Sequence, residues 1–267
     1  MKRSKIILLA LAGVALLAPV RYAGAQSITP AFGDLILGFR AGGGVGGALD
    51  LEVDLGSISN FYDAAPNSTF TLPQLAAQDL IDTYGASWNT RTDLFWGAVS
   101  TTGRVSGYDV NPKDTLWATA PNGAPAWQQA SQFAQGPASA NIEPMYDAGS
   151  PGTLNGATPT TNSASAAVLS NGATGSWGYQ DTKTTGTSFG YFNPTVDNSA
   201  NTASGPAISQ LYQLQPGSGA ATLLGNLILG SDGTLSFQAV PEPSAGVLVL
   251  LGLGSVLMLR RRKASRV

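Results

Sequence analysis

Apolar and polar residues alternate over residues 33–40 and again over 49–55. Period-two alternation is typical of a β-strand that buries one of its faces. A glycine-rich segment separates the two stretches and suits a turn. The pattern therefore predicts two strands joined by a turn, with Asp50, Glu52 and Asp54 on the solvent-facing side of the second strand.

Two segments have helical spacing of their apolar residues. Residues 72–84 follow Thr71, a plausible cap, and precede Gly85, which suits a helix stop. Residues 125–135 form the second segment, which ends before a further glycine. We therefore expect two short helices.

The remaining apolar stretches predict further short strands. They lie at 93–100, 104–108, 115–119, 208–214, 221–229 and 234–239. The last two flank Ser231-Asp232-Gly233, a hairpin signal. The segment 147–206 is rich in Ser, Thr and Gly, and we expect loops or edge strands there. The whole pattern predicts a mainly β passenger domain over 26–239, with a sandwich-like antiparallel arrangement.

Composition narrows the chemistry that is available. The chain has 267 residues, no Cys and no His, which excludes thiolate nucleophiles, the Ser-His-Asp triad and metal sites built on Cys or His. Between residues 26 and 240 there are five basic and 15 acidic residues, so this segment is a poor candidate for nucleic-acid binding. We expect no cofactor and no enzymatic activity.

The first 25 residues have the order of a secretory signal peptide. Three basic residues lie within the first five positions, an apolar run follows over 6–20, and the small residues Ala23 and Ala25 come next. We expect export through the secretion translocon and cleavage after Ala25. The alternative is an uncleaved N-terminal anchor, although the run is shorter than the ~20 residues of a typical membrane span.

The C-terminal segment, residues 240–267, contains three parts in order. The first part is the polar motif Pro241, Glu242, Pro243 and Ser244. A short apolar stretch at 245–259 comes next and predicts a transmembrane helix of about 22 Å, shorter than the ~30 Å hydrocarbon core. The third part is the basic cluster Arg260, Arg261, Arg262 and Lys263. This cluster should remain in the cytoplasm while the preceding domain lies outside the inner membrane.

This tripartite tail resembles the PEP-CTERM sorting signal of Gram-negative bacteria. The resemblance covers about a tenth of the chain. It implies recognition by exosortase, an integral-membrane processing enzyme that removes the helix and releases or re-anchors the protein outside. It also implies a role at the cell surface or in the extracellular matrix of a bacterium that produces exopolysaccharide. The alternative for the tail is an ordinary single-pass anchor.

Several other patterns match catalytic or binding motifs only in part. Gly42, Gly44 and Gly47 fit a dinucleotide-binding fingerprint, but a strand rather than a helix follows them. The serine of Gly186–Gly190 has the spacing of a nucleophile elbow but no histidine to activate it. Asp50, Glu52 and Asp54 are weak candidates for a metal site, since an EF-hand-like start lacks its later ligands.

A carbohydrate-active protein is the competing hypothesis. Carboxylate pairs that would suit a glycosidase are Asp79 with Asp82, and Asp109 with Asp114. Five tryptophans offer surfaces for stacking on sugars, although most are expected in the core. The favoured function remains an exported, non-enzymatic surface protein, and the alternative is a secreted carbohydrate-binding or carboxylate-dependent protein.

Overall fold

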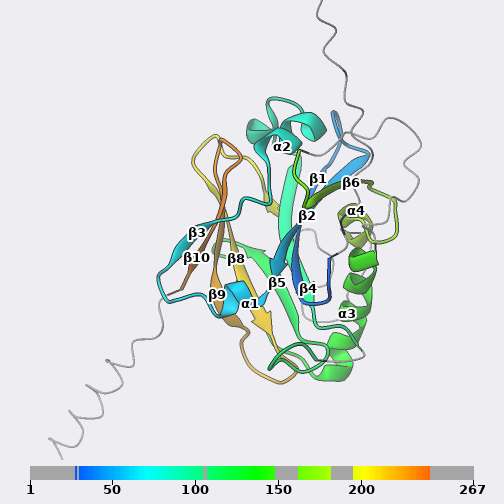
Figure 1. Cartoon of the computed structure of the whole chain (residues 1–267), viewed down its shortest axis with the longest axis vertical. Coiled ribbons are helices and arrows are strands. Elements are labelled where there is room, and N and C mark those ends of the chain that lie inside the picture. The colour runs from blue at the N-terminus through cyan, green and yellow to red at the C-terminus, as the bar shows by residue number, and fades with distance from the viewer. Residues whose placement is uncertain (1–27, 29, 105–106, 148–161, 182–194, 241–267) are drawn as a thin grey trace, which may run out of the picture.

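The structure is a computed structural model that describes residues 28, 30–104, 107–147, 162–181 and 195–240 (Figure 1). Ten antiparallel strands form one sheet in the order β3-β10-β9-β8-β5-β4-β1-β2-β6, and β7 pairs with β4. The strands are β1 (Asp34–Ala41), β2 (Leu49–Ser57), β3 (Thr69–Thr71), β4 (Leu94–Thr101), β5 (Leu116–Pro121), β6 (Ala166–Ser170), β7 (Asn198–Ser199), β8 (Ala207–Leu214), β9 (Thr222–Leu229) and β10 (Leu235–Ala239). The helices are α1 (Ser59–Tyr62), α2 (Ala77–Tyr84), α3 (Gln132–Asp147) and α4 (Trp177–Asp181), with a 3-10 turn η1 (Trp88–Thr90).

The prediction of a mainly β, antiparallel protein is confirmed. The predicted sandwich-like arrangement is not observed. All the described strands belong to one curled sheet and not to two stacked sheets. Phe39 on β1 and Phe237 on β10 belong to the same buried cluster although four strands lie between β1 and β10 in the sheet order. Large sheets twist and curl. Curling here lets one sheet enclose a core that two sheets would otherwise share.

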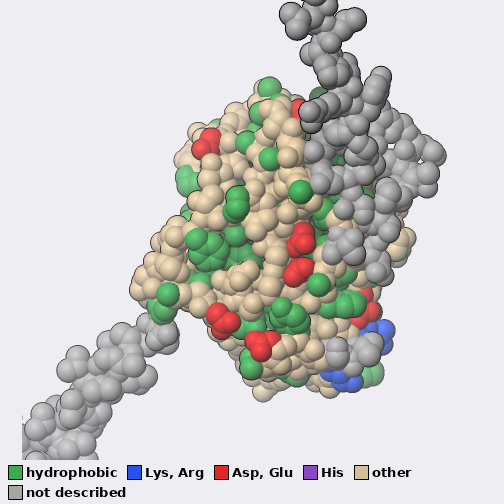
Figure 2. All heavy atoms as spheres, viewed as in Figure 1, with side chains coloured by type: hydrophobic (Ala, Val, Ile, Leu, Met, Phe, Trp, Pro, Cys, Tyr) green, Lys and Arg blue, Asp and Glu red, His purple; other side chains and the backbone are tan. Residues whose placement is uncertain are grey.

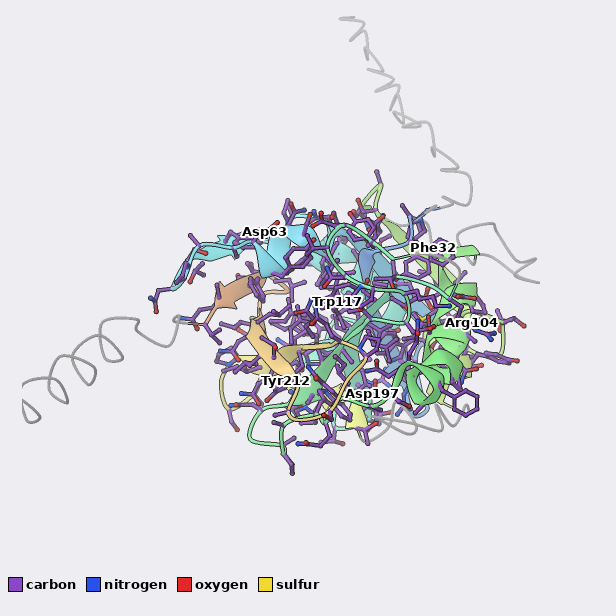
Figure 3. All side chains as sticks on the ribbon, turned by 90° about the horizontal axis from the view of Figure 1, so that it is seen from below. Phe32, Asp63, Arg104, Trp117, Asp197 and Tyr212 are labelled. Carbon is purple, nitrogen blue, oxygen red and sulfur yellow. The ribbon has the colours of Figure 1, made fainter. Side chains whose placement is uncertain are left out.

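The two faces of the sheet each bury a core. The enclosed face carries Leu35, Leu37 and Phe39, together with Trp96 and Trp117. Figure 3 shows Trp117 in the interior of the molecule, and its side chain is fully buried. On the opposite face α3 lies against β4 and β5, and α4 lies against β1 and β2. Helices therefore cover only one half of that face.

The predicted hairpin at the end of the domain is confirmed. Leu229 of β9 pairs with Leu235 of β10. Gly230 donates its N–H to the Thr234 carbonyl at 2.8 Å, and Gly233 takes the positive φ of 83° that the turn requires. The strand expected at 104–108 does not form among its described residues, where Tyr108 pairs only with Asn111 in an isolated bridge.

The helix predictions succeed once and fail once. The first helix forms as α2 and ends at Tyr84, as expected before Gly85, but it begins at Ala77 and not at residue 72, and the predicted cap Thr71 belongs to β3. The second was predicted at 125–135 but begins at Gln132 and runs to Asp147 through two prolines. Helix α3 buries residues at the helical spacing of positions i, i+4, i+7 and i+8, which are Ala138, Ile142, Met145 and Tyr146. Burial of this stripe against the sheet outweighs the helix-breaking tendency of Gly and Pro, which is why the local prediction was wrong.

Tyr84 connects α2 to the first hairpin, and its loss should destabilise the protein. Its buried hydroxyl donates to the Phe39 carbonyl at 2.6 Å and accepts from the Leu51 N–H at 3.0 Å. Tyr84→Phe leaves both backbone groups without this partner, so we expect a loss of about 1–3 kcal/mol in the free energy of unfolding. Urea unfolding measures this loss. Tyr62→Phe is the control, because Tyr62 bonds Asp109 at the surface, and an equal loss in both variants would contradict the argument.

Candidate functional site

The last strand delivers the chain directly to the predicted sorting motif. Ala239 donates its N–H to the Ser68 carbonyl at 2.9 Å, and Val240 donates to the Leu224 carbonyl at 3.1 Å. Ordered backbone hydrogen bonds therefore continue to the residue that immediately precedes Pro241. The motif Pro241 to Ser244, the helix predicted at 245–259 and the basic cluster lie outside the described residues.

Strand β10 is an integral part of the core. It lies between β9 and β3 in the sheet. Phe237 is fully buried and packs against Phe61, with ring centroids 5.1 Å apart and planes at 82°, and against Phe70 at 5.5 Å. The sorting segment consequently begins where the folded sheet ends, with no intervening linker in the sequence.

The predicted signal peptide lies outside the described residues as well, including Ala23 and Ala25. Within the part of the chain that the structure describes, no helix has the length and apolar character needed to cross a membrane. On the face shown in Figure 2, the Asp and Glu side chains are scattered, while the Lys and Arg side chains gather at the lower right.

The second hairpin strand carries buried carboxylates, which the sequence pattern did not predict. Asp50 is 0% exposed and Glu52 is 1% exposed, so the predicted solvent-facing side of β2 was wrong for both. Helix α4 covers them, and Gly178 donates its N–H to Asp50 Oδ2 at 2.7 Å. One oxygen of each carboxylate, Asp50 Oδ1 and Glu52 Oε1, is buried without a hydrogen-bond partner.

Burial dominates the ionisation of this pair. Desolvation raises the pKa of Asp50 to about 7, although the Gly178 amide, the Ser176 hydroxyl and the Arg40 charge act in the opposite direction. Desolvation and then the nearby Asp50 charge raise the pKa of Glu52 well above its usual value. Asp50 therefore titrates near neutral pH, and burial favours the uncharged form of Glu52.

A buried ion pair lies beside the carboxylates. Arg40 Nε donates to Asp197 Oδ2 at 2.6 Å, and the two side chains are 11% and 0% exposed. Trp177 Nε1 donates to the other oxygen, Asp197 Oδ1, at 2.7 Å. Arg40 also stacks over the Phe95 ring at 4.8 Å from its centroid. We call Arg40, Asp50, Glu52, Trp177 and Asp197 the buried polar cluster.

The buried polar cluster could have been predicted from the sequence if the pairing register of the first hairpin had been considered together with the alternation. Arg40 of β1 pairs directly with Asp50 of β2, and Gly38 pairs with Glu52. Once the hairpin register is known, a cation opposite an anion and a glycine opposite a glutamate indicate a crowded polar interior. Gln180 belongs to the same buried layer of α4 and was missed completely; neither atom of its amide has a hydrogen-bond partner.

The weak metal candidates do not converge on one ion. Asp54 caps the end of its strand by accepting the Gly56 N–H at 2.8 Å. Among the residues that the structure describes, no group of three or more acidic side chains is arranged to hold a metal. Asp50 and Glu52 instead meet the backbone of α4, so their chemistry is structural.

The other candidate motifs also serve the fold. Carbonyls of the glycine loop accept from Arg91, with Nη2 at 2.6 Å from the Gly43 oxygen, and no helix follows the loop. Asp79, one of the carboxylates considered for a glycosidase pair, is 1% exposed and accepts hydrogen bonds from both nitrogens of Asn162. The serine pattern at 186–190 lies outside the described residues.

The tryptophans do not form an exposed aromatic platform. We expected most of them in the core, and all five are at most 9% exposed. They are Trp88, Trp96, Trp117, Trp127 and Trp177. In the other carboxylate pair, Asp109 and Asp114, Asp109 Oδ2 accepts a hydrogen bond from the Tyr62 hydroxyl. Neither observation assembles a glycosidase site.

The geometry so far defines a β-rich domain whose final strand leads without a linker into a C-terminal targeting segment. Residues 239–263 match the family model of the PEP-CTERM protein-sorting motif, and the match begins at the last residue of β10. The chain therefore carries a PEP-CTERM sorting signal, which supports exosortase-type sorting of an exported protein. Neither the curated proteins nor the solved structures contain a match to this chain.

Proposed function

We propose that this chain is an exported, non-enzymatic cell-surface or extracellular-matrix protein that exosortase processes at its C-terminal tail. The single observation that carries the proposal is the sorting motif at residues 239–263. The predicted helix at 245–259 anchors the chain in the inner membrane until processing. The absence of Cys and His supports a non-enzymatic role, because most nucleophile and base pairs need one of them.

The end of the sheet supports the proposal that tail removal leaves the domain intact. Every described strand ends before Pro241, and Val240 is the last residue with a described backbone bond, to Leu224. Cleavage beyond Val240 breaks none of the sheet hydrogen bonds of β10. A processing enzyme also binds extended backbone, and the two prolines of the motif disfavour helix there.

Replacing Pro241, Glu242 and Pro243 with alanine should block processing. The expected result is full-length protein in the membrane fraction of the native host, where the parent chain is shortened, as measured by intact mass and terminal peptides. Pro66→Ala is the control, since Pro66 is an exposed proline outside the motif. Unchanged shortening of the triple variant would remove the motif from the mechanism.

A further inference from the structure

One half of the sheet presents a face without any charged residue. Strands β8, β9, β10 and β3 come from sequence ranges 198–231, 233–240 and 64–78, and none of the three contains Lys, Arg, Asp or Glu. The chain between residues 26 and 240 is otherwise acidic. A charge-free surface of four strands in such a domain calls for a partner that is itself uncharged.

The side chains of this face form rows across the strands. Leu227, Leu235 and Phe237 point into the enclosed core, so their neighbours along each strand point to the opposite face. Strand pairing aligns a first row, which is Gln210, Asn226, Gln238 and Thr69. A second row holds Ile208, Ile228, Ser236 and Thr71. We call these two rows the uncharged face.

The helices leave the uncharged face open. Helix α3 packs on β4 and β5, and α4 packs on β1 and β2, at the other half of the sheet (Figure 1). Gln238, Thr69 and Thr71 are exposed, and Asn226 and Ser236 are partly exposed. Gln210 already accepts a hydrogen bond from the Tyr212 hydroxyl at 3.1 Å, whereas among the described residues the side-chain amides of Asn226 and Gln238 make none. Amide donors and acceptors are therefore available in register on neighbouring strands.

A pocket adjoins the first row. Gln210 pairs with Ala120 of β5, and Ala120 lines a pocket of about 370 Å³ together with Pro121, Pro125 and Trp127. This volume lies within the range of small-molecule sites, roughly 300–1,000 Å³. Among the described residues the lining is mainly apolar, and Trp127 is its aromatic member. Trp127 is 9% exposed, so it gives the pocket a small apolar contact for a sugar ring and not a stacking platform.

We propose that the uncharged face binds a strand of neutral polysaccharide, with one sugar unit in the Trp127 pocket. Sugar hydroxyls both donate and accept, and so do the amides and hydroxyls of the two rows. Neighbouring strands lie about 4.8 Å apart, so the first row presents a polar group at regular steps across four strands, as a repeating polymer requires. An anionic or cationic polymer would find no countercharge on these strands. The inference goes beyond the proposed sorting function and does not depend on tail processing.

Affinity electrophoresis tests the proposal with the full chain in mild detergent. Gels contain hydroxyethyl cellulose, laminarin or dextran as neutral probes, and alginate or chitosan as anionic and cationic probes. At least one neutral polymer is expected to retard the protein, and neither charged polymer should do so. The double variant Asn226→Ala/Gln238→Ala should weaken this binding about tenfold, since each lost hydrogen bond contributes about 0.5–1.5 kcal/mol.

A matched control separates the surface from general polarity. Asn60→Ala/Gln78→Ala removes the same two side-chain types at exposed positions on α1 and α2, and its retardation should equal that of the parent chain. Both double variants should keep the parent melting temperature. Failure of all neutral probes, or equal retardation of the two double variants, would overturn the proposal. Self-association that only Asn226→Ala/Gln238→Ala abolishes would assign the face to a second copy of the chain and would also overturn it.

Discussion

Gly38→Ala is expected to destroy the native packing of this protein. A Cβ at this position would lie 2.0 Å from Cε3 and 2.1 Å from Cδ2 of Trp177. The indole has no room to retreat, because it is fully buried and its Nε1 is bonded to Asp197. Overpacking usually costs about 1–3 kcal/mol, and an overlap this deep should exceed that range. Far-UV and near-UV circular dichroism with urea unfolding measure the loss.

Gly42→Ala is the matched control for this experiment. Gly42 directly follows β1, and a Cβ there would meet only Asp93, at 3.5 Å and 3.6 Å, which is ordinary contact. We expect its unfolding midpoint to stay close to that of the parent chain. A Gly38→Ala protein with parental stability would show that Trp177 does not occupy the space above β1.

Asp50→Asn is expected to stabilise the protein at neutral and alkaline pH. Burial raises the pKa of Asp50 from 3.8 to about 7, so the folded state resists the negative charge that the unfolded chain accepts freely. Between these two values the folded state binds more protons than the unfolded state, and stability therefore falls as pH rises through this window. A neutral asparagine removes this loss, and the oxygen of its amide still accepts the Gly178 N–H.

The size and sign of the effect are both measurable. The shift corresponds to at most about 4 kcal/mol above pH 7, and we expect Asp50→Asn to recover about 2–4 kcal/mol there and little at pH 4. Chemical unfolding between pH 4 and pH 8 gives the slope for each variant. Glu52→Gln should act in the same direction, because burial also raises the pKa of Glu52 well above its usual value and the folded state again resists a charge that the unfolded chain accepts.

Asp232→Asn provides a control of opposite sign. The backbone N–H of Thr234, followed by its hydroxyl, lowers the pKa of this exposed carboxylate, so its contribution is present above pH 3.8 and is lost as pH falls. Asp232→Asn should therefore lower the free energy of unfolding slightly at neutral pH.

For Asp50 the opposite result decides the argument. If Asp50→Asn destabilised the protein at pH 8, a desolvated carboxylate at position 50 would be contradicted.

Local sequence rules succeeded where one strand or turn fixes its own conformation. The alternation around Leu35 and Leu51 placed the first hairpin, and Ser231-Asp232-Gly233 placed the last one. The same rules failed for α3, whose Gly and Pro residues argue against a helix. They failed again for Asp50 and Glu52, because alternation separates the two faces of a strand but does not tell which face another layer will cover.

By itself the sequence determined the antiparallel β character and the sorting signal at 239–263, since both rest on local order along the chain. Only the tertiary structure decided that both faces of β2 are buried and that β3, β10, β9 and β8 present a charge-free face. Both outcomes depend on how one sheet curls and where α3 and α4 pack on it. Such contacts join residues far apart in sequence, and periodicity carries no record of them.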